Sequence, residues 1–205
     1  MKNNVIVSLA DSNYFELLNE LINSIKSFNE SSDVAICILD AGLTEEQKNL
    51  LSKKVEEIKS AEWDIEVPGY KVRGKEWLKS QVSRAFLTKY FPNYKKYLWI
   101  DCDAWVQDWS SIELYFKACE NGKLGITQTM GSGYKIMSKV KWIFGKIASV
   151  KSQNFKHALS SKIGIDKARK LAFAPHINIG VFSLERESSC WKSWQDNLFQ
   201  TLNSG

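Results

Sequence analysis

The segment Lys96-Tyr97-Leu98-Trp99-Ile100 is apolar and aromatic, and it runs directly into the acidic triplet Asp101-Cys102-Asp103. Such a run predicts a central strand that is buried on both faces of a sheet. Open α/β sheets bind ligands at the carboxyl ends of their strands, which is where this triplet would lie. Two carboxylates one residue apart favour a hard cation such as Mg²⁺ or Mn²⁺, which commonly holds substrate phosphates. Because Asp-X-Asp pairs are also common in surface turns, the interpretation depends on the surrounding segments.

Apolar runs alternate with segments of helical periodicity through the first 128 residues. The alternation predicts parallel strand–helix–strand units and an α/β fold. The predicted strands are 4–9, 33–39, 61–67, 96–100 and 123–128. The predicted helices are 17–28, 44–58 with a capping box at Thr44 to Gln47, 76–90, and one capped by Ser110 or Ser111 that runs to Cys119. A strand at 176–184 and a helix from about Ser188 complete the pattern.

Composition places the chain among ordinary globular proteins. It has 205 residues, of which 44% are hydrophobic and 25% charged, and it shows no repeat or low-complexity tract. We therefore predict one domain over residues 1–205. No early segment has the form of a signal peptide, and no apolar run reaches membrane-spanning length. The cysteines show no C-x-x-C spacing and are expected to be free thiols in the cytoplasm; they are Cys37, Cys102, Cys119 and Cys190.

Positive charge is concentrated in residues 134–170, which carry ten Lys or Arg residues against the single acid Asp166. Apolar residues recur there at helical spacing opposite Lys135, Lys139 and Lys146, so the segment predicts a basic amphipathic helical insertion. Two interpretations stay open. The helix packs on the core with a solvated lysine face, or it contacts an anionic membrane surface or a charged acceptor. A nucleic-acid partner is disfavoured because no recognised nucleic-acid module is visible.

The turn after the first strand holds Asp11, Asn13 and Tyr14. In a doubly wound sheet this turn is a usual nucleotide site, where a polar side chain bonds a base edge and a tyrosine stacks on its face. From these residues alone a simple N-cap cluster is the favoured interpretation. Arg84, on the predicted 76–90 helix, is within reach of a phosphate, although a lone helical arginine is more often solvated.

Four blocks in order resemble the family 8 glycosyltransferases, which include glycogenin and bacterial lipopolysaccharide galactosyltransferases and glucosyltransferases. The blocks are Leu9–Tyr14, Leu39–Glu46, Tyr97–Asp103 and Ile177–Val181. The resemblance implies a GT-A fold, which is a Rossmann-like, mostly parallel sheet flanked by helices. It also implies a retaining hexosyltransferase that uses a UDP-sugar and Mn²⁺ or Mg²⁺. The expected acceptor is a cell-surface glycan or a lipid-linked molecule, as in lipopolysaccharide or capsule synthesis at the inner face of the membrane.

The resemblance also assigns roles by position, although it identifies no catalytic residue. Asp101 and Asp103 would bind the metal, and the Cys102 backbone would lie against the ribose. Ala10, Asp11, Asn13 and Tyr14 would hold the uridine. Arg84 would lie near the donor, and Asn178 and Gly180 would line the sugar site.

Two features depart from the family pattern. The family's later His-x-x-Gly-x-x-Lys-Pro-Trp segment, whose histidine is a third metal ligand, is absent, and neither His157 nor His176 has that context. Ile179 stands where the family prefers a small residue. The alternative hypothesis is therefore a non-catalytic sugar-nucleotide-binding or interaction domain, a truncated or degenerate transferase.

Overall fold

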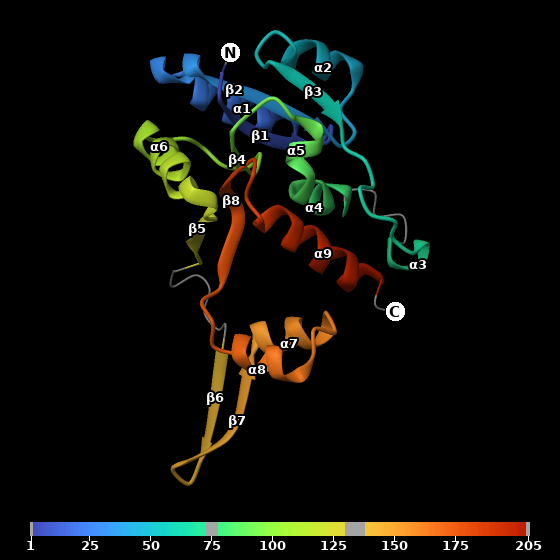
Figure 1. Ribbon diagram of the computed structural model, residues 1–205, viewed down its shortest axis with the longest axis vertical. Coiled ribbons are helices and arrows are strands. Elements are labelled where there is room, and N and C mark those ends of the chain that lie inside the picture. The colour runs from blue at the N-terminus through green and yellow to red at the C-terminus, as the bar shows by residue number, and fades with distance from the viewer. Residues whose placement is uncertain (1, 73–77, 130–137, 204–205) are drawn as a thin grey trace. The chain divides into compact units, whose positions relative to one another are not determined.

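The computed structural model describes residues 2–72, 78–129 and 138–203 (Figure 1). Within the single domain predicted for residues 1–205, contacts group into two compact units. The first, here called the sheet unit, comprises Met1–Ile126 and Ile179–Leu198. The second, here called the hairpin unit, comprises Thr127–Asn178 and Phe199–Gly205. In the described ranges, no helix combines the length and apolar composition needed to cross a bilayer.

A six-stranded sheet forms the centre of the sheet unit, with strand order β3-β2-β1-β4-β8-β5. Its strands are β1 (Asn4–Ala10), β2 (Val34–Asp40), β3 (Glu57–Ser60), β4 (Lys96–Ile100), β5 (Gly125–Gln128) and β8 (Ile177–Glu185). The pairs β1–β2, β1–β4 and β2–β3 are parallel, whereas β8 pairs with β4 in antiparallel orientation. The predicted α/β fold with a mostly parallel sheet is confirmed.

Helices cover both faces of this sheet (Figure 1). The helices of the sheet unit are α1 (Phe15–Lys26), α2 (Glu45–Leu51), α3 (Gly69–Val72), α4 (Lys79–Ser83), α5 (Leu87–Tyr90), α6 (Trp109–Ala118) and α9 (Cys190–Asn203). Short 3-10 turns are η1 (Asn29–Asp33), η3 (Arg84–Phe86) and η4 (Glu120–Gly122). Alternate residues of β4 enter two different apolar clusters, Leu98 with α1 and α6, and Trp99 with α5 and α9. Because both faces are covered, the strand reads as a continuous apolar run.

Several predicted boundaries are wrong. The third strand is Glu57–Ser60 rather than 61–67, and the helix predicted to reach residue 58 ends at Leu51. The reason is that β3 is a short edge strand in which every second position is charged, namely Glu57 and Lys59. It therefore lacks the apolar run of a central strand. The predicted 76–90 helix is divided among α4, η3 and α5, and its residues 76–77 lie outside the described residues.

Helix starts were predicted with mixed success. The capping box of α2 is confirmed, since Thr44 Oγ1 accepts from the Gln47 N–H and Gln47 Oε1 accepts from the Thr44 N–H. For α6 the predicted serine cap is wrong. Asp108 is the N-cap, and its carboxylate accepts from the Ser110 N–H at 2.8 Å. A charged acceptor at this position also complements the positive end of the helix dipole.

The basic helix predicted within residues 134–170 is wrong for its first half. Strands β6 (Ser138–Ile143) and β7 (Lys146–Ser152) form an antiparallel hairpin instead, while Lys135 lies outside the described residues. Lysines and apolar residues alternate with a period of two along Lys139–Trp142, and this pattern also satisfies part of a helical repeat. The turn decides the outcome, because Phe144 and Gly145 both have positive φ, at 49° and 72°. Helices α7 (Gln153–Ser160) and α8 (Ile165–Leu171) follow.

Gly125 lies where the start of β5 meets β8 and α6. A Cβ at this position would stand 2.2 Å from Ser183 Oγ and 3.2 Å from the Tyr115 carbonyl oxygen. Ser183 Oγ itself donates to that carbonyl at 2.6 Å, so the serine cannot move without losing the bond. We expect Gly125→Ala to lower the free energy of unfolding by about 2 kcal/mol in a denaturant titration. Gly69→Ala is the control, because no atom lies within 4 Å of its added Cβ; equal stability of the two variants would contradict the prediction.

Candidate functional site

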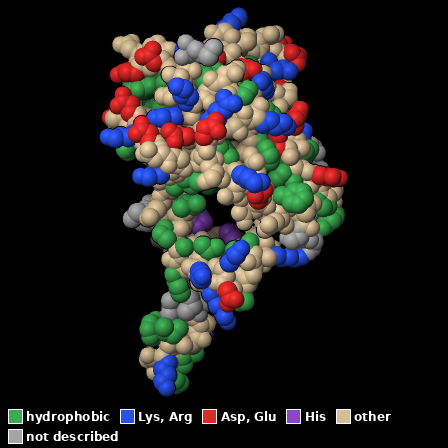
Figure 2. Space-filling model, viewed as in Figure 1, with side chains coloured by type: hydrophobic (Ala, Val, Ile, Leu, Met, Phe, Trp, Pro, Cys, Tyr) green, Lys and Arg blue, Asp and Glu red, His purple; other side chains and the backbone are tan. Residues whose placement is uncertain are grey.

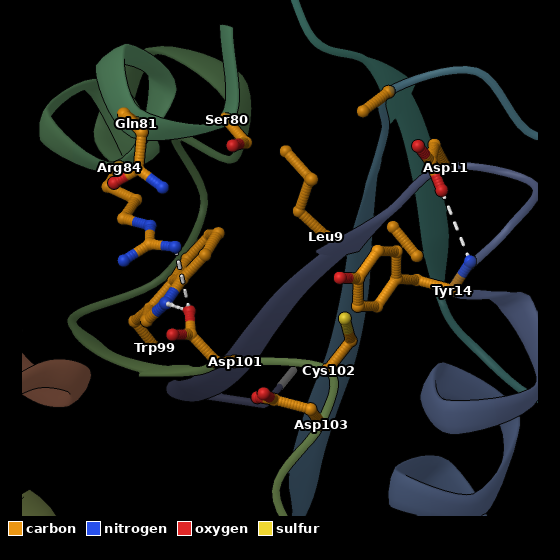
Figure 3. Close-up of a pocket in the computed structure, with 12 residues that line it drawn as sticks. Leu9, Asp11, Tyr14, Ser80, Gln81, Arg84, Trp99, Asp101, Cys102 and Asp103 are labelled. Atoms are coloured by element: carbon orange, nitrogen blue, oxygen red, sulfur yellow. Dashed lines mark hydrogen bonds and ion pairs between the residues drawn. The ribbon is translucent and has the colours of Figure 1, made fainter. Parts of the chain in front are cut away.

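A cavity of about 540 Å³ opens beside the carboxyl ends of β1 and β4 in the sheet unit (Figure 3). Seven of the site residues predicted from sequence line it, namely Ala10, Asp11, Tyr14, Arg84, Asp101, Cys102 and Asp103. The other lining residues are Leu9, Ala41, Ser80, Gln81 and Trp99. The fold thus brings together two segments that are about ninety residues apart in the sequence, at the edge where open α/β sheets bind ligands.

The turn after β1 is ordered by the carboxylate of Asp11. Its Oδ1 accepts from the backbone N–H of Asn13 at 2.9 Å and of Tyr14 at 3.1 Å. The N-cap interpretation of this cluster is wrong, because the N-cap of α1 is Tyr14 and no side chain caps that helix. Asp11 orders the turn before the helix and borders the cavity. The Tyr14 side chain is half exposed and lies on the same side of the cavity (Figure 3). Asn13 is exposed and is not among the lining residues.

Arg84, Asp101 and Trp99 form a bonded cluster on the other side of the cavity (Figure 3). Arg84 Nη2 lies 2.9 Å from Asp101 Oδ1, and the Trp99 indole N–H donates to the same oxygen at 2.7 Å. The guanidinium also lies over the indole ring, 4.9 Å from its centroid. Arg84 is only 8% exposed, so the solvated-surface interpretation of this arginine is wrong. The cluster places the buried Arg84 guanidinium and the Asp101 carboxylate at the cavity wall.

Burial and neighbouring charges shift the ionisation of this cluster. Burial raises the pKa of Asp101, while the Arg84 guanidinium and the Trp99 N–H pull it down and the charge of Asp103 pushes it up. Burial also lowers the pKa of Arg84. The pKa of the Cys102 thiol rises to about 11, chiefly by burial and then by the charge of Asp103. The Cys102 side chain is thus a neutral thiol near neutral pH and not a thiolate nucleophile.

The two carboxylates of the triplet differ in how much of their bonding capacity is used. The Oδ1 atom of Asp101 contacts Arg84 and Trp99, while its Oδ2 atom accepts no hydrogen bond from any residue in the described ranges. Asp103 is exposed at the cavity and makes no hydrogen bond or ion pair with another described residue. Three carboxylate oxygens are therefore available to a hard cation, which would also relieve the repulsion between the two charges.

This donor set fits a cation that keeps other ligands. Among the described residues, no group of three or more His, Cys, Asp or Glu side chains has the geometry of a metal site. Mg²⁺ and Mn²⁺ are commonly held by one or two carboxylates, with water and substrate phosphates completing the shell. Asp101 and Asp103 suit that kind of site better than a closed, all-protein one.

Asn178 and Gly180 do not line the cavity. Gly180 instead contributes its carbonyl oxygen, which accepts from the Asp101 N–H at 2.8 Å and ties β8 to the end of β4. Asn178 belongs to the hairpin unit.

Sequence reasoning missed Trp99 and the pair Ser80 and Gln81 as lining residues. Trp99 precedes Asp101 by two positions, so strand alternation places both on one face. Ser80 and Gln81 precede Arg84 by one helical turn, so helical spacing was the signal.

Known proteins share both sequence features and fold with this chain. The model of glycosyl transferase family 8 matches residues 5–173. No curated protein sequence matches the chain. The solved structure of the bifunctional glycosyltransferase WbbM has a TM-score of 0.60 at 16% identity, over 99% of this chain and 35% of its own. The galactosyltransferase LgtC, solved with donor and acceptor sugar analogues, has a TM-score of 0.56 at 16% identity, over 97% of this chain and 68% of its own.

A mannosyltransferase, Ktr4p from S. cerevisiae, has a TM-score of 0.51 at 11% identity, over 97% of this chain and 60% of its own. At these identities the structural likeness shows a common fold, and the fold is the GT-A type predicted from the sequence blocks. The family assignment comes from the sequence match, which spans most of the 205 residues. The chain belongs to glycosyl transferase family 8.

Proposed function

We propose that this family 8 glycosyltransferase is metal-dependent, takes its sugar from a UDP-sugar and transfers it with retention of configuration. The observation that carries the proposal is the single cavity lined by both the Asp11–Tyr14 turn and the Asp101–Asp103 triplet. One segment offers polar and aromatic groups suited to a nucleoside, and the other offers carboxylates and a buried arginine suited to a metal diphosphate.

Different residues are suited to different parts of the donor. The half-exposed ring of Tyr14 suits stacking on a base, and Asp11 holds the turn that positions it. Arg84 adds positive charge in a site of low dielectric constant, where it acts on an anionic donor more strongly than in water. Asp101 and Asp103 would hold the cation, which when bound neutralises the charge of the diphosphate leaving group as a Lewis acid. Contacts to base and ribose position the sugar from a distance.

The acceptor belongs to the same proposal. We infer a glycan or lipid-linked acceptor, as in lipopolysaccharide or capsule synthesis, with the protein acting in the cytoplasm at the inner face of the membrane. The supporting observation is the basic segment 134–170, with Lys135, Lys139 and Lys146, whose charge complements an anionic membrane surface.

Nucleotide selectivity tests this function. We expect calorimetric titration of the chain to show UDP binding only when Mn²⁺ or Mg²⁺ is present, and weaker binding of GDP under the same conditions. The reason is that two carboxylates alone repel a diphosphate, whereas a bridging cation attracts it. Transfer from UDP-sugars to water or acceptor, with the product anomer read by NMR, then tests retention.

Two outcomes would change the proposal. Equal binding of UDP and GDP would remove the uridine assignment. Metal-dependent UDP binding without turnover of any UDP-sugar would favour the alternative hypothesis, a sugar-nucleotide-binding domain without catalysis.

A further inference from the structure

The hairpin formed by β6 and β7 carries large apolar side chains that nothing in the described ranges covers. Trp142 is 61% exposed, Ile147 is 57% exposed and Phe144, at the tip, is fully exposed. Trp142 and Ile147 are partners across the hairpin, next to the turn, so the apolar residues gather at one end. Figure 2 shows hydrophobic and basic side chains together over this end of the hairpin unit. A patch of this kind marks an interaction surface.

The turn between β6 and β7 has a residue that is unfavourable for its backbone conformation. Ile143 pairs with Lys146, so Phe144 and Gly145 form a two-residue connection in which both φ angles are positive. Such turns favour Asn-Gly or Gly-Gly, because a bulky side chain is disfavoured in the left-handed region. A phenyl ring at this position makes no compensating packing, since it is fully exposed. A strained residue without a structural reason points to a function of its side chain.

Lysines surround this apolar tip. Lys141 and Lys146 are exposed and form no ion pair with any described residue. The combination of exposed aromatic residues with nearby lysines matches the chemistry of the headgroup region of a bilayer.

We propose that the tip of the β6–β7 hairpin inserts Phe144 and Trp142 into the interface of an anionic bilayer while its lysines contact lipid phosphates. The inference rests on the membrane contact proposed above and adds the element and side chains that make it. Insertion is shallow, because a two-stranded sheet has unpaired backbone groups at both edges and these must stay hydrated. An acidic soluble partner would pair with the lysines but leave the apolar tip unexplained.

Phe144→Asn is the decisive variant, because asparagine suits the left-handed turn and keeps the hairpin while removing the ring. The whole chain is co-sedimented with phosphatidylcholine vesicles that contain, or lack, phosphatidylglycerol. We expect wild-type binding to the anionic vesicles and roughly tenfold weaker binding of Phe144→Asn. The matched control is Leu114→Asn on α6, which removes an apolar side chain that is 66% exposed in the sheet unit and is expected to bind as wild type.

Charge reversal tests the lysines separately. Lys141→Glu with Lys146→Glu should weaken binding to anionic vesicles by at least about 25-fold, since each positive charge lost costs about fivefold and each new negative charge adds repulsion. The loss should shrink at high salt. Lys53→Glu, at an exposed position in the sheet unit, is the control.

The outcomes separate the hairpin from the wider proposal. If wild type binds and Phe144→Asn binds equally well, the hairpin assignment is wrong and membrane contact stands. If wild type does not bind anionic vesicles, both fail. UDP titration of the same variants is expected to be unchanged in either case, so the donor site is judged independently.

Discussion

Replacing Asp103 with asparagine is expected to abolish metal-dependent UDP binding. The substitution keeps the shape of the side chain and removes the charge that faces the cavity without a partner among the described residues. Loss of groups that merely support a metal ligand costs 10- to 100-fold in affinity, so loss of a ligand should cost roughly 100-fold or more. Isothermal titration of UDP with Mn²⁺ into wild type and Asp103→Asn measures the difference.

Asp196→Asn is the matched control for this experiment. Asp196 lies on α9, where its carboxylate pairs with Lys192 at 3.5 Å and remains mostly exposed. Its neutralisation changes the net charge of the protein by the same amount, and we expect UDP affinity to be unaltered. If Asp103→Asn binds UDP and Mn²⁺ as wild type does, the metal assignment of the triplet is wrong.

Replacing Arg84 with methionine is expected to lower the free energy of unfolding by about 3 kcal/mol, because it leaves the Asp101 carboxylate without its cation. This value is at the lower end for buried pairs, since the Asp101 side chain is 32% exposed and water screens it in part. Methionine keeps most of the aliphatic volume over Trp99, so the effect reports charge more than packing. A denaturant titration measures it. Arg169→Met removes an exposed pair with Asp166 and should change stability little.

The same variant should alter the dependence of stability on pH. In the folded protein the pKa of Asp101 already lies above its ordinary value, so folding favours the protonated form. Its contribution to stability is therefore greatest below the unfolded pKa and is lost as pH rises through the folded pKa. Removing Arg84 raises that folded pKa further, so the loss should extend to higher pH than in wild type. If the free energy of unfolding falls with pH in the same way for wild type and Arg84→Met, this assignment is wrong.

The sequence predicted best where pattern and environment are both local. The apolar run of β4, the capping box of α2 and the helical repeat of α1 each contain their own signal, and all three form as expected. The cavity was predictable for a related reason. Parallel strands bring their carboxyl ends to one edge, so Asp11 and Asp101 meet once the fold class is known.

The errors arise where tertiary contacts or a turn decide between patterns. β3 is too polar to predict as a strand, and it forms because the β2 edge offers backbone partners. The segment around Lys139–Trp142 satisfies both a strand and a helix pattern, and Phe144-Gly145 gave no standard turn signal. Gly180 acts through its carbonyl oxygen, a backbone group whose partner depends on the sheet rather than on residue type.

The antiparallel pairing of β4 with β8 has a consequence for how the protein is made. The Asp101 N–H finds its acceptor only on Gly180, so the end of β4 is completed by a strand synthesised long after it. During translation the acidic triplet is synthesised before β8, and it can pair with β8 only after a long intervening loop has closed. Closing that loop has an entropic cost. If the hairpin unit collapses first, it shortens that loop. We therefore expect the triplet to reach its final geometry only after β8 has been synthesised.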